Sequence, residues 1–426
     1  MQHTDQTLLE ELTLDRQTLH RHPEEGWTEF FTTHYICERL EQLGLPCTVG
    51  PALVSAEHLL GRDEAKVSAA RARALSWGVP EAFIDRLDGI TGVVCEVDTG
   101  RAGPTTVCRF DIDCVCVEET DDPAHIPNRD GFCSLNKGFM HACGHDAHTS
   151  VGLAVAAWLA ENRESLCGKI RLIFQPAEEG ARGAYAMTAA GWVDDADYFI
   201  ASHVGGLARL GEIFISTGGM LASTKLDIDF TGVASHAGAE PEKGHSALLA
   251  GAAASLMIAG IPRHSKGDSR VSIGTFTAGE GRNVTPVHAR LQVETRGTVQ
   301  EVNDYLEAQV KQIVSGVALT YGVESKVTVA GVAKTIAYSE SLADTTLELA
   351  RTIPGVTHVQ KDSRPAASED CTHFMHRVTE KGGQAVHFVF GANHQGHHRK
   401  NFDIQPECMV YATRLFAKLV ARLNAR

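Results

Sequence analysis

Short apolar segments alternate with helical segments over most of the 426-residue chain, and this alternation restricts the folds open to it. Segments typical of strands lie at 92–97, 105–112, 169–175 and 198–203, and an Ala-rich apolar helix is expected over 151–159. Strands that alternate with helices at this spacing are typical of α/β proteins with a largely parallel sheet. The sequence therefore predicts an α/β fold in which helices flank a mostly parallel central sheet.

The pattern changes near Thr217 and returns near Lys334. The segments between these points that are typical of strands or helices lie at 225–230, 246–258, 271–276, 289–295, 302–315 and 326–329. They form two strand–helix–strand halves, which is typical of a compact unit. We therefore expect one discontinuous domain made of residues 1–216 and 334–426, interrupted by a smaller α+β domain over 217–333.

The formal net charge of −14 narrows the range of partners. An acidic surface repels nucleic-acid phosphates and anionic lipids, so we expect neither nucleic acid nor a membrane as a partner. A small anionic substrate stays possible where a few Arg or His residues bind it. No apolar run approaches the ~20 residues that a transmembrane helix needs, and residues 1–5 lack the features of a signal peptide.

The eleven cysteines are an odd number and are scattered along the chain. In a reducing compartment all of them can be small buried side chains, so the sequence favours a cytoplasmic protein. Cys114 and Cys116 alternate with valines, which predicts a strand that packs in the core. Only Cys143 has neighbours that suggest chemistry.

A His-rich loop precedes the expected helix at 151–159. It reads His141-Ala142-Cys143-Gly144-His145-Asp146-Ala147-His148. Cys143 and His145 are two residues apart, and they can face one divalent ion where the backbone turns at Gly144. A thiolate and an imidazole are ligands of transition metals. The neighbouring His141, Asp146 and His148 can add ligands or support them, so the loop predicts a metal site.

Further candidates follow the ends of other expected strands. Glu178 and Glu179 follow the end of the strand at 169–175, and the carboxyl end of a strand is where α/β proteins place ligand sites. Adjacent carboxylates in extended backbone point in different directions, so one can bind a metal while the other acts as a general base. By itself such a pair is more often a solvated turn. His203 ends the strand at 198–203, and taken alone it would be more often structural.

A last cluster, His394, His397 and His398, lies near the C-terminus. One of the three can be a metal ligand, and the residues themselves leave open which one.

Taken together, these segments resemble the M20 metallopeptidase family, in particular its amidohydrolase branch of aminoacylases, hippurate hydrolases and auxin-conjugate hydrolases. The matching pieces, in family order, are Asp111-Ile112-Asp113, the loop His141–His148, Gln175–Gly180, Ser235-His236-Ala237-Gly238, Gly281-Arg282-Asn283-Val284 and His398. The insertion at 51–89, residues 129–132 and residues 368–370 further resemble the p-aminobenzoyl-glutamate hydrolase subgroup.

The resemblance implies two divalent metal ions with Cys143 bridging them. His145 and Glu179 would bind one ion, and His203 and His398 the other. Asp113 would orient a ligand imidazole. Asp111 stands where many related peptidases have a metal-binding His. Zn, Mn, Co and Ni all suit this donor set, with Mn or Zn favoured.

The resemblance also implies a reaction. Glu178 would act as general base and acid for a water activated by the two ions. This water would cleave the amide bond of an N-acyl amino acid, for instance an aroyl amino acid such as p-aminobenzoyl-glutamate. The inserted domain would be a lid that also dimerises, with His236 stabilising the oxyanion in the other subunit's site. Asn283 and Arg296 would hold the substrate carboxylate. Without the resemblance, His236 would be a surface residue and Arg296 a partner of Glu294.

Two other functions stay open at this point. The same metal site can attack an activated aromatic carbon and release ammonia from an aminobenzoate-type amine. Alternatively, the chain can be a non-catalytic partner in a hetero-oligomer, because the p-aminobenzoyl-glutamate enzyme pairs two homologous subunits. The complete set of expected metal ligands together with Glu178 argues against a non-catalytic role.

Overall fold

The computed structural model describes residues 5–364 and 367–426, and the chain divides into two compact units. The first unit comprises the chain up to Gly219 together with Ile336–Arg364 and Asp370–Arg426, and the second is built mainly of Met220–Thr335. The helices of the first unit are α1 (Asp5–Arg21), α2 (Phe30–Gln42), α3 (Glu64–Ser76), α4 (Glu81–Leu87), α5 (Ile126–Arg129), α6 (His145–Asn162), α7 (Gly183–Ala189), α10 (Glu340–Ala350), α11 (Thr372–Glu380) and α12 (Glu407–Leu423). Its strands are β1 (Val93–Asp98), β2 (Thr105–Asp111), β3 (Lys169–Gln175), β4 (Tyr198–Val204), β5 (Glu212–Ser216), β10 (His358–Asp362) and β11 (Gln384–Phe390).

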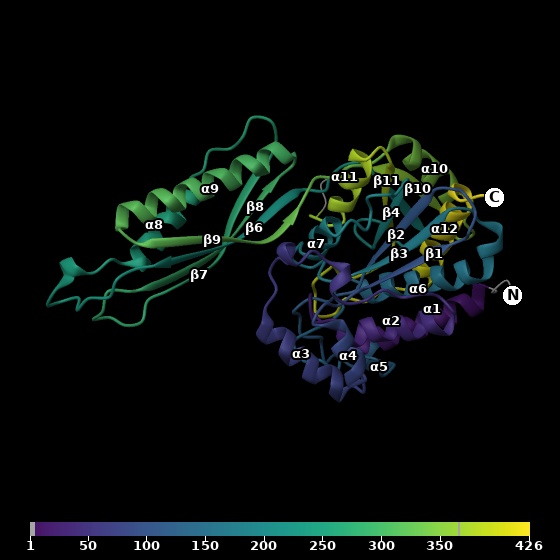
Figure 1. Ribbon diagram of the computed structural model, residues 1–426, viewed down its shortest axis with the longest axis horizontal. Helices are drawn as coiled ribbons and strands as arrows, with labels where there is room; N and C mark the ends of the chain where they lie inside the picture. Colours follow the sequence, from purple (N-terminus) through teal and green to yellow (C-terminus); the bar gives the residue numbers. More distant parts are fainter. Residues whose placement is uncertain (1–4, 365–366) are drawn as a thin grey trace. The chain divides into compact units, whose positions relative to one another are not determined.

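The seven strands form one sheet in the order β1-β3-β2-β4-β11-β5-β10 (Figure 1). Four neighbouring pairs are parallel, and only β1 with β3 and β11 with β5 are antiparallel. Side chains on the two faces of the sheet pack in different cores. Phe110 and Phe174 pack with α6 and α12 on one face, whereas Val107 and Ile173 pack with α7 and α11 on the other. Burial on both faces explains the nearly continuous apolar runs. The predicted α/β architecture with a mostly parallel sheet is confirmed.

Helix α6 packs tightly against this sheet and carries the His-rich loop at its N-terminal end. A Cβ at Gly152 would lie 2.6 Å from the Phe174 ring and 2.7 Å from the Phe110 ring, so only glycine permits this approach. Gly144 precedes the helix with φ of 87°, a conformation that favours glycine. The tight turn at Gly144 places Cys143 and His145 at the carboxyl edge of the sheet.

The second unit has its own core. Its strands are β6 (Ala222–Thr231), β7 (Ser269–Ala278), β8 (His288–Gly297) and β9 (Glu324–Ala333), and its helices are α8 (Ala247–Ala259) and α9 (Gln300–Tyr321). The strands pair antiparallel throughout in the order β7-β8-β6-β9. Apolar side chains of the sheet, such as Ile228 and Leu291, pack against α8 and α9, which lie on one face (Figure 1).

One local prediction is wrong. The alternation at Cys114–Val117 does not form a strand: Cys114 and Val115 each make a single bridge, and the Val117 N–H turns back to the Val115 carbonyl at 2.9 Å. Cys114 is buried, but Cys116 is exposed. Four alternating residues carry too little signal to separate a strand from a turn.

Within the described residues, no helix is both long and apolar enough to cross a membrane.

A buried ion-pair network joins α1 to the start of α6. His20 contacts Asp146 through Nδ1 at 2.8 Å and Glu119 through Nε2 at 3.1 Å. Arg16 contacts the same Asp146 at 3.2 Å. Burial alone would lower the pKa of His20, but the hydrogen bonds to the two carboxylates outweigh it and raise the pKa to about 9. His20 is therefore charged at neutral pH and ties α1 to the His-rich loop.

We expect this network to make stability depend on pH. Because the folded-state pKa of His20 is raised above 6.5, its contribution is full below pH 6.5 and is lost as the pH rises through about 9. His20→Gln should therefore destabilise by about 2–3 kcal/mol near pH 6 and by much less near pH 10. Urea unfolding of both proteins at the two pH values measures this difference, and a cost that is the same at both would contradict a charged His20.

Candidate metal centre

The carboxyl ends of four neighbouring strands, β3, β2, β4 and β11, bring the candidate residues to one edge of the sheet. Asp111 ends β2, Glu178 and Glu179 follow β3, and His203 lies at the end of β4. His398 follows β11. Since these strands are parallel to one another, their ends meet at one edge, which is where α/β proteins bind ligands.

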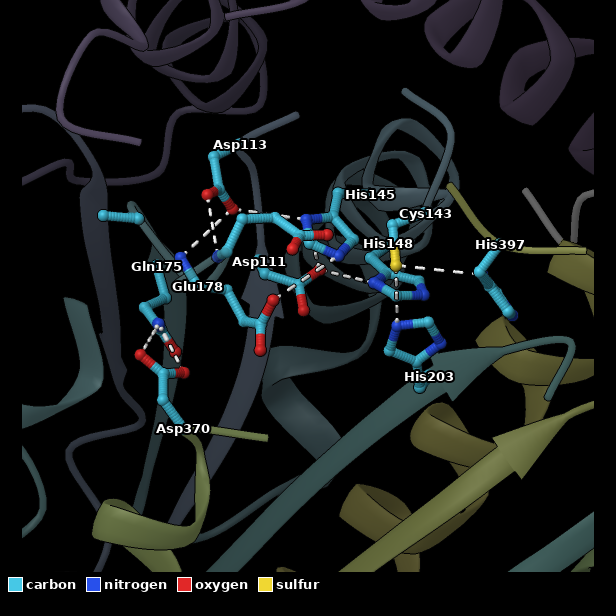
Figure 2. Close-up of polar contacts among 12 residues, drawn as sticks. Asp111, Asp113, Cys143, His145, His148, Gln175, Glu178, His203, Asp370 and His397 are labelled. Carbon is cyan, nitrogen blue, oxygen red and sulfur yellow. Dashed lines mark hydrogen bonds and ion pairs between the residues drawn. The ribbon is translucent and has the colours of Figure 1, made fainter. Parts of the chain in front are cut away.

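Cys143 lies at the centre of this edge, between two imidazoles (Figure 2). Its Sγ is 3.5 Å from His203 Nε2 and 3.7 Å from His397 Nδ1. His203 Nδ1 donates to the Val204 carbonyl at 2.9 Å, so the Nε2 lone pair of a neutral His203 faces the sulfur. His397 has the opposite tautomer, because its Nε2 accepts the Gly206 N–H at 3.2 Å and its Nδ1–H therefore faces the sulfur. His203 can bind a metal beside Cys143, whereas His397 can only donate to the sulfur.

His145 presents a free nitrogen to the same centre. Its Nδ1 is 3.2 Å from Asp113 Oδ1, which fixes the proton on that atom. Its Nε2 is buried and has no hydrogen-bond partner among the described residues. A buried nitrogen without a partner is costly unless it binds something, so Nε2 fits a metal ligand. Burial lowers the pKa of His145, but Asp111, Asp113 and Glu179 outweigh it and raise the pKa to about 10, so a metal that binds Nε2 would displace its proton.

Glu179 and His398 form a second side of the centre, with Glu179 Oε1 and His398 Nε2 3.1 Å apart. Two groups of possible ligand atoms share the cysteine, and each group lies within 4.8 Å: Cys143 with His145 and His203, and Cys143 with Glu179 and His398. A further group joins His145 with Glu178 and Glu179, so His145 lies near the Glu179 carboxylate as well as near His203. The expected five ligands thus come together around Cys143, and which of them share an ion stays a prediction.

Asp113 fixes the turn that carries the two glutamates. One oxygen accepts the Glu178 N–H at 3.1 Å, and the other accepts the Glu179 N–H at 2.9 Å (Figure 2). Glu178 Oε2 lies 3.9 Å from His145 Nε2, and Glu178 forms a further group of possible ligand atoms with His145 and Glu179. The Asp113 carboxylate thus orients His145 and also holds the backbone of both glutamates, as expected for a residue that supports a metal site.

Charge also favours cations here. Burial, and then the carboxylates of Glu179, Glu178 and Asp111, raise the pKa of the Cys143 thiol well above its ordinary value. The thiolate form that binds metals therefore needs positive charge close by. Two divalent ions would supply that charge, and the mixture of thiolate, imidazole and carboxylate donors fits Zn and Mn among others. The residues present therefore fit the expected pair of ions.

Asp111 and His148 lie beside the centre and contact each other. Both ring nitrogens of His148 already have partners, so His148 has no free ligand atom. His148 Nδ1 makes a short contact with Asp111, and His148 Nε2 accepts the Val204 N–H at 2.9 Å. Although burial raises the pKa of Asp111, His145, His148 and Arg109 hold it well below its ordinary value. His141 is buried with both nitrogens unpaired among the described residues, and burial lowers its pKa to about 3. It is therefore neutral and does not join any of the ligand groups found.

The remaining candidates lie in the second unit. His236 is exposed, and its Nδ1 accepts the N–H groups of Gly238 and Ala239 at 3.2 and 3.0 Å, so the proton of the neutral ring lies on Nε2. The N–H of Ala237, the residue after His236, donates to the Asn283 carbonyl at 3.2 Å. This hydrogen bond brings the candidates His236 and Asn283 close together in the chain fold. Arg296 lies on β8 and pairs with Glu294 at 3.0 Å, which is the alternative raised for it above.

Glu29 is a residue of the centre that sequence reasoning missed. It is fully buried at the start of α2, accepts the Ala177 N–H at 2.8 Å and accepts the Thr91 hydroxyl at 2.6 Å. Ala177 has φ of 53°, which a non-glycine residue rarely adopts. Glu29 therefore holds the strained residue that precedes Glu178. Nothing in its local sequence distinguishes it from a solvent-exposed glutamate.

We expect Glu29→Ala to lower kcat by roughly 10- to 100-fold, because a small misplacement of Glu178 is costly. Metal content should stay unchanged, since Glu29 is in none of the ligand groups found. Glu29→Gln is the matched control. Burial and the nearby Asp113 carboxylate raise the pKa of Glu29, so a neutral amide resembles the native group and should keep most activity. Steady-state kinetics with metal analysis measures both, and loss of metal in Glu29→Ala would contradict the assignment.

The family comparison matches most of the chain. Residues 107–422 match the model of "Peptidase family M20/M25/M40". A homolog of a p-aminobenzoyl-glutamate hydrolase subunit, from Haemophilus influenzae, is 41% identical over 417 residues, covering 97% of this chain and 99% of its own. An indole-3-acetyl-aspartic acid hydrolase of Enterobacter agglomerans is 43% identical over 414 residues, covering 96% and 95%.

Solved structures agree with the fold. The aminobenzoyl-glutamate utilization protein of Klebsiella pneumoniae has a TM-score of 0.85 and 37% identity, and the match covers 98% of this chain and 97% of that one. The YXEP protein of Bacillus subtilis, described as a dinuclear metal-binding peptidase from the M20 family, has a TM-score of 0.67 at 23% identity, covering 99% and 100%. The second likeness supports the shared fold alone.

Proposed function

The chain belongs to peptidase family M20/M25/M40 and is a hydrolase of C–N bonds, and on this premise we propose that it cleaves the amide bond between an aromatic acyl group and an acidic amino acid. The observation that carries the proposal is the pair of ligand groups that share Cys143, with Glu178 beside them. A site of this kind suits attack by water on an amide carbonyl.

Cys143, His145 and His203 would hold one ion, and Cys143, Glu179 and His398 the other. Two such ions would polarise the carbonyl oxygen and lower the pKa of a bound water. Glu178 would take the proton of that water and pass it to the leaving nitrogen. Asp113 keeps the Nδ1 proton of His145 in place, so that Nε2 stays a ligand throughout. Zn or Mn are the ions that we propose first.

The substrate class is supported by two relatives. Their names join p-aminobenzoyl to glutamate and indole-3-acetyl to aspartic acid, so each combines an aromatic acyl group with an acidic amino acid. We propose that Arg296 and Asn283 bind a substrate carboxylate, since a guanidinium binds carboxylates through two parallel hydrogen bonds. His236 would donate a hydrogen bond from Nε2 to the oxyanion. Its Nε2–H is available because Nδ1 already accepts backbone N–H groups.

Assembly and location are proposals as well. The second unit would serve as a lid through which two copies dimerise, with His236 acting in the partner's site. A homologous partner chain is supported by relatives whose names describe them as one subunit of p-aminobenzoyl-glutamate hydrolase. A cytoplasmic location is supported by the eleven cysteines, which are all free thiols.

Product identification tests the proposed reaction. Protein loaded with Zn or Mn is incubated with a panel of aroyl- and indolylacetyl-amino acids and with aminobenzoates, and products are identified by mass. The expected result is release of the free amino acid and the free aromatic acid, fastest for glutamate or aspartate conjugates. Glu178→Gln prepared in the same way is the control for background hydrolysis. Ammonia release from aminobenzoates without amide cleavage would contradict the proposal and favour a deaminase.

For the carboxylate site, we expect Arg296→Ala to raise KM about 10- to 100-fold for an acyl-glutamate, because a charged hydrogen-bonding partner is lost. An analogue with that carboxylate amidated should change little. Arg296→Lys should recover only part of the loss, since an ammonium cannot reproduce the paired geometry. Glu294→Gln is the control: it removes the ion pair of Arg296 but leaves the guanidinium, so KM should not rise. Equal effects on both substrates would show that Arg296 acts only in folding.

A further inference from the structure

Cys37 and Cys47 form a close thiol pair in the first unit, apart from the metal centre. Their sulfurs are 3.0 Å apart, which is only about 1 Å longer than a disulfide bond of ~2.05 Å. Cys37 lies in α2, and Cys47 lies in the segment that follows. None of the ligand groups at the sheet edge includes either residue.

The chain reversal after α2 creates the pair. The helix ends at Gln42, and Gly44 turns the chain with φ of 67°. The Leu45 N–H then donates back to the Leu40 carbonyl at 2.9 Å. Thr48 pairs with Val94 of β1 through two backbone hydrogen bonds of 2.8 and 3.0 Å. Because both ends of the segment are held, Cys47 is fixed beside Cys37.

The surroundings make the two thiols unequal. They lie in a surface pocket where Arg86, Glu41, Glu38 and His34 supply the charged and titratable groups. Cys37 is buried, with 5% of its surface exposed, whereas Cys47 is half-buried. The Cys37 thiol lowers the pKa of Cys47; burial opposes this, Arg86 reinforces it and Glu41 weakens it. The pKa of Cys37 is raised by Cys47 and by burial. Cys47 is the more exposed of the two thiols, in a pocket that also contains the Arg86 guanidinium, so it is the thiol that we expect to act as the nucleophile.

We propose that Cys47 and Cys37 form a reactive dithiol site that hydroperoxides oxidise to a reversible disulfide, with Cys47 as the attacking thiol and Cys37 as the resolving thiol. The Cys47 thiolate attacks the terminal oxygen of the peroxide, the O–O bond breaks, and the leaving alkoxide takes a proton. Cys47 is oxidised to a sulfenic acid while the peroxide is reduced to an alcohol, or to water for hydrogen peroxide. The Cys37 sulfur then attacks the Cys47 sulfur, the S–O bond breaks, and hydroxide leaves as water with the Cys37 proton.

The other cysteines provide internal controls. Cys116 is exposed but single, and burial and the Glu25 carboxylate raise the pKa of its thiol. Cys95 and Cys108 are buried, and burial raises the pKa of each. If exposure alone decided reactivity, Cys116 would react before Cys47. The proposal predicts the reverse order.

The test uses the full, metal-loaded chain, which keeps the thiol of the metal centre occupied. The protein is treated with low concentrations of hydrogen peroxide, blocked with an alkylating agent and digested with trypsin. Arg39 lies between the two cysteines, so they fall on different peptides, 22–39 and 40–62. The expected product is this peptide pair joined by a disulfide, with the loss of two hydrogens, at a rate at least ~10-fold above oxidation of Cys116. A thiol reductant should restore both peptides.

Two variants separate the roles. Cys37→Ser should accumulate a sulfenic acid at Cys47 that a cyclic dione traps, whereas Cys47→Ser should leave Cys37 reduced under the same conditions. Arg86→Gln should slow the first step. Absence of the linked peptides in the wild-type protein, or oxidation of Cys116 as fast as Cys47, would overturn the proposal. So would a sulfenic acid at Cys37 in Cys47→Ser. The wild-type digest depends on no variant folding correctly.

Discussion

Glu178→Gln is expected to lower kcat by ~10³ or more while leaving metal binding nearly intact. Glu178 carries the proposed proton transfers, and an amide can neither take the proton of the water nor return it to the leaving nitrogen. The substitution keeps the size of the side chain, and the Asp113 carboxylate still holds the backbone at 3.1 Å. Stopped assays of amide cleavage, together with metal content by elemental analysis, measure the two effects separately.

Glu179→Gln is the matched comparison, because its carboxylate belongs to the group with Cys143 and His398. The neighbouring His398 and His145 lower the pKa of Glu179 despite its burial, so it is ionised and ready to bind a cation. This variant should lose one metal ion together with activity. If both variants lost metal equally, the division between a general base and a ligand at these adjacent positions would be wrong.

The sequence predicted the parts of the site that follow strands, because their position depends on topology alone. Glu178, Glu179 and His203 stand at the ends of apolar segments, and parallel pairing brings those ends together. Which of these ligands share an ion stays a prediction, because it depends on where side chains point at a shared edge. His397 and His398 show the same limit, because contacts made by the fold separate them: His397 accepts the Gly206 N–H, whereas His398 lies 3.1 Å from Glu179.

Buried polar partners were missed for a related reason. Glu29 is distant in the sequence from Ala177, and its function comes from one hydrogen bond that the fold creates. Cys47 and Cys37 become a pair only because Gly44 reverses the chain. The exposed Cys116 is the opposite case, in which a local alternation suggested burial that the turn at Val117 prevents. Local patterns thus predicted the long strands and helices but not the short segment at Cys114–Val117, whereas contacts between elements decide roles.

Cys143 is expected to be the residue whose loss removes the most metal. It is the only member common to the groups with His203 and with His398, so Cys143→Ala should weaken both sites and lower activity by ~10³ or more. Burial and three carboxylates raise the pKa of its thiol, so binding of divalent ions must displace its proton. Metal loading of the wild-type protein should therefore release protons in proportion to the ions bound, and the variant should release fewer.

Alkylation provides a second, independent readout of the same residue. The thiol should be protected when Zn or Mn is bound and should react after chelation, and added metal should not restore activity to the alkylated protein. Cys116 is the control, since it is exposed and lies in no ligand group found, so its labelling should not depend on metal. Equal labelling of Cys143 with and without metal would falsify its role as a ligand. In that case His145 and His203, the other members of one ligand group, would have to hold a cation without the thiol, and one ion, not two, would be the expected content.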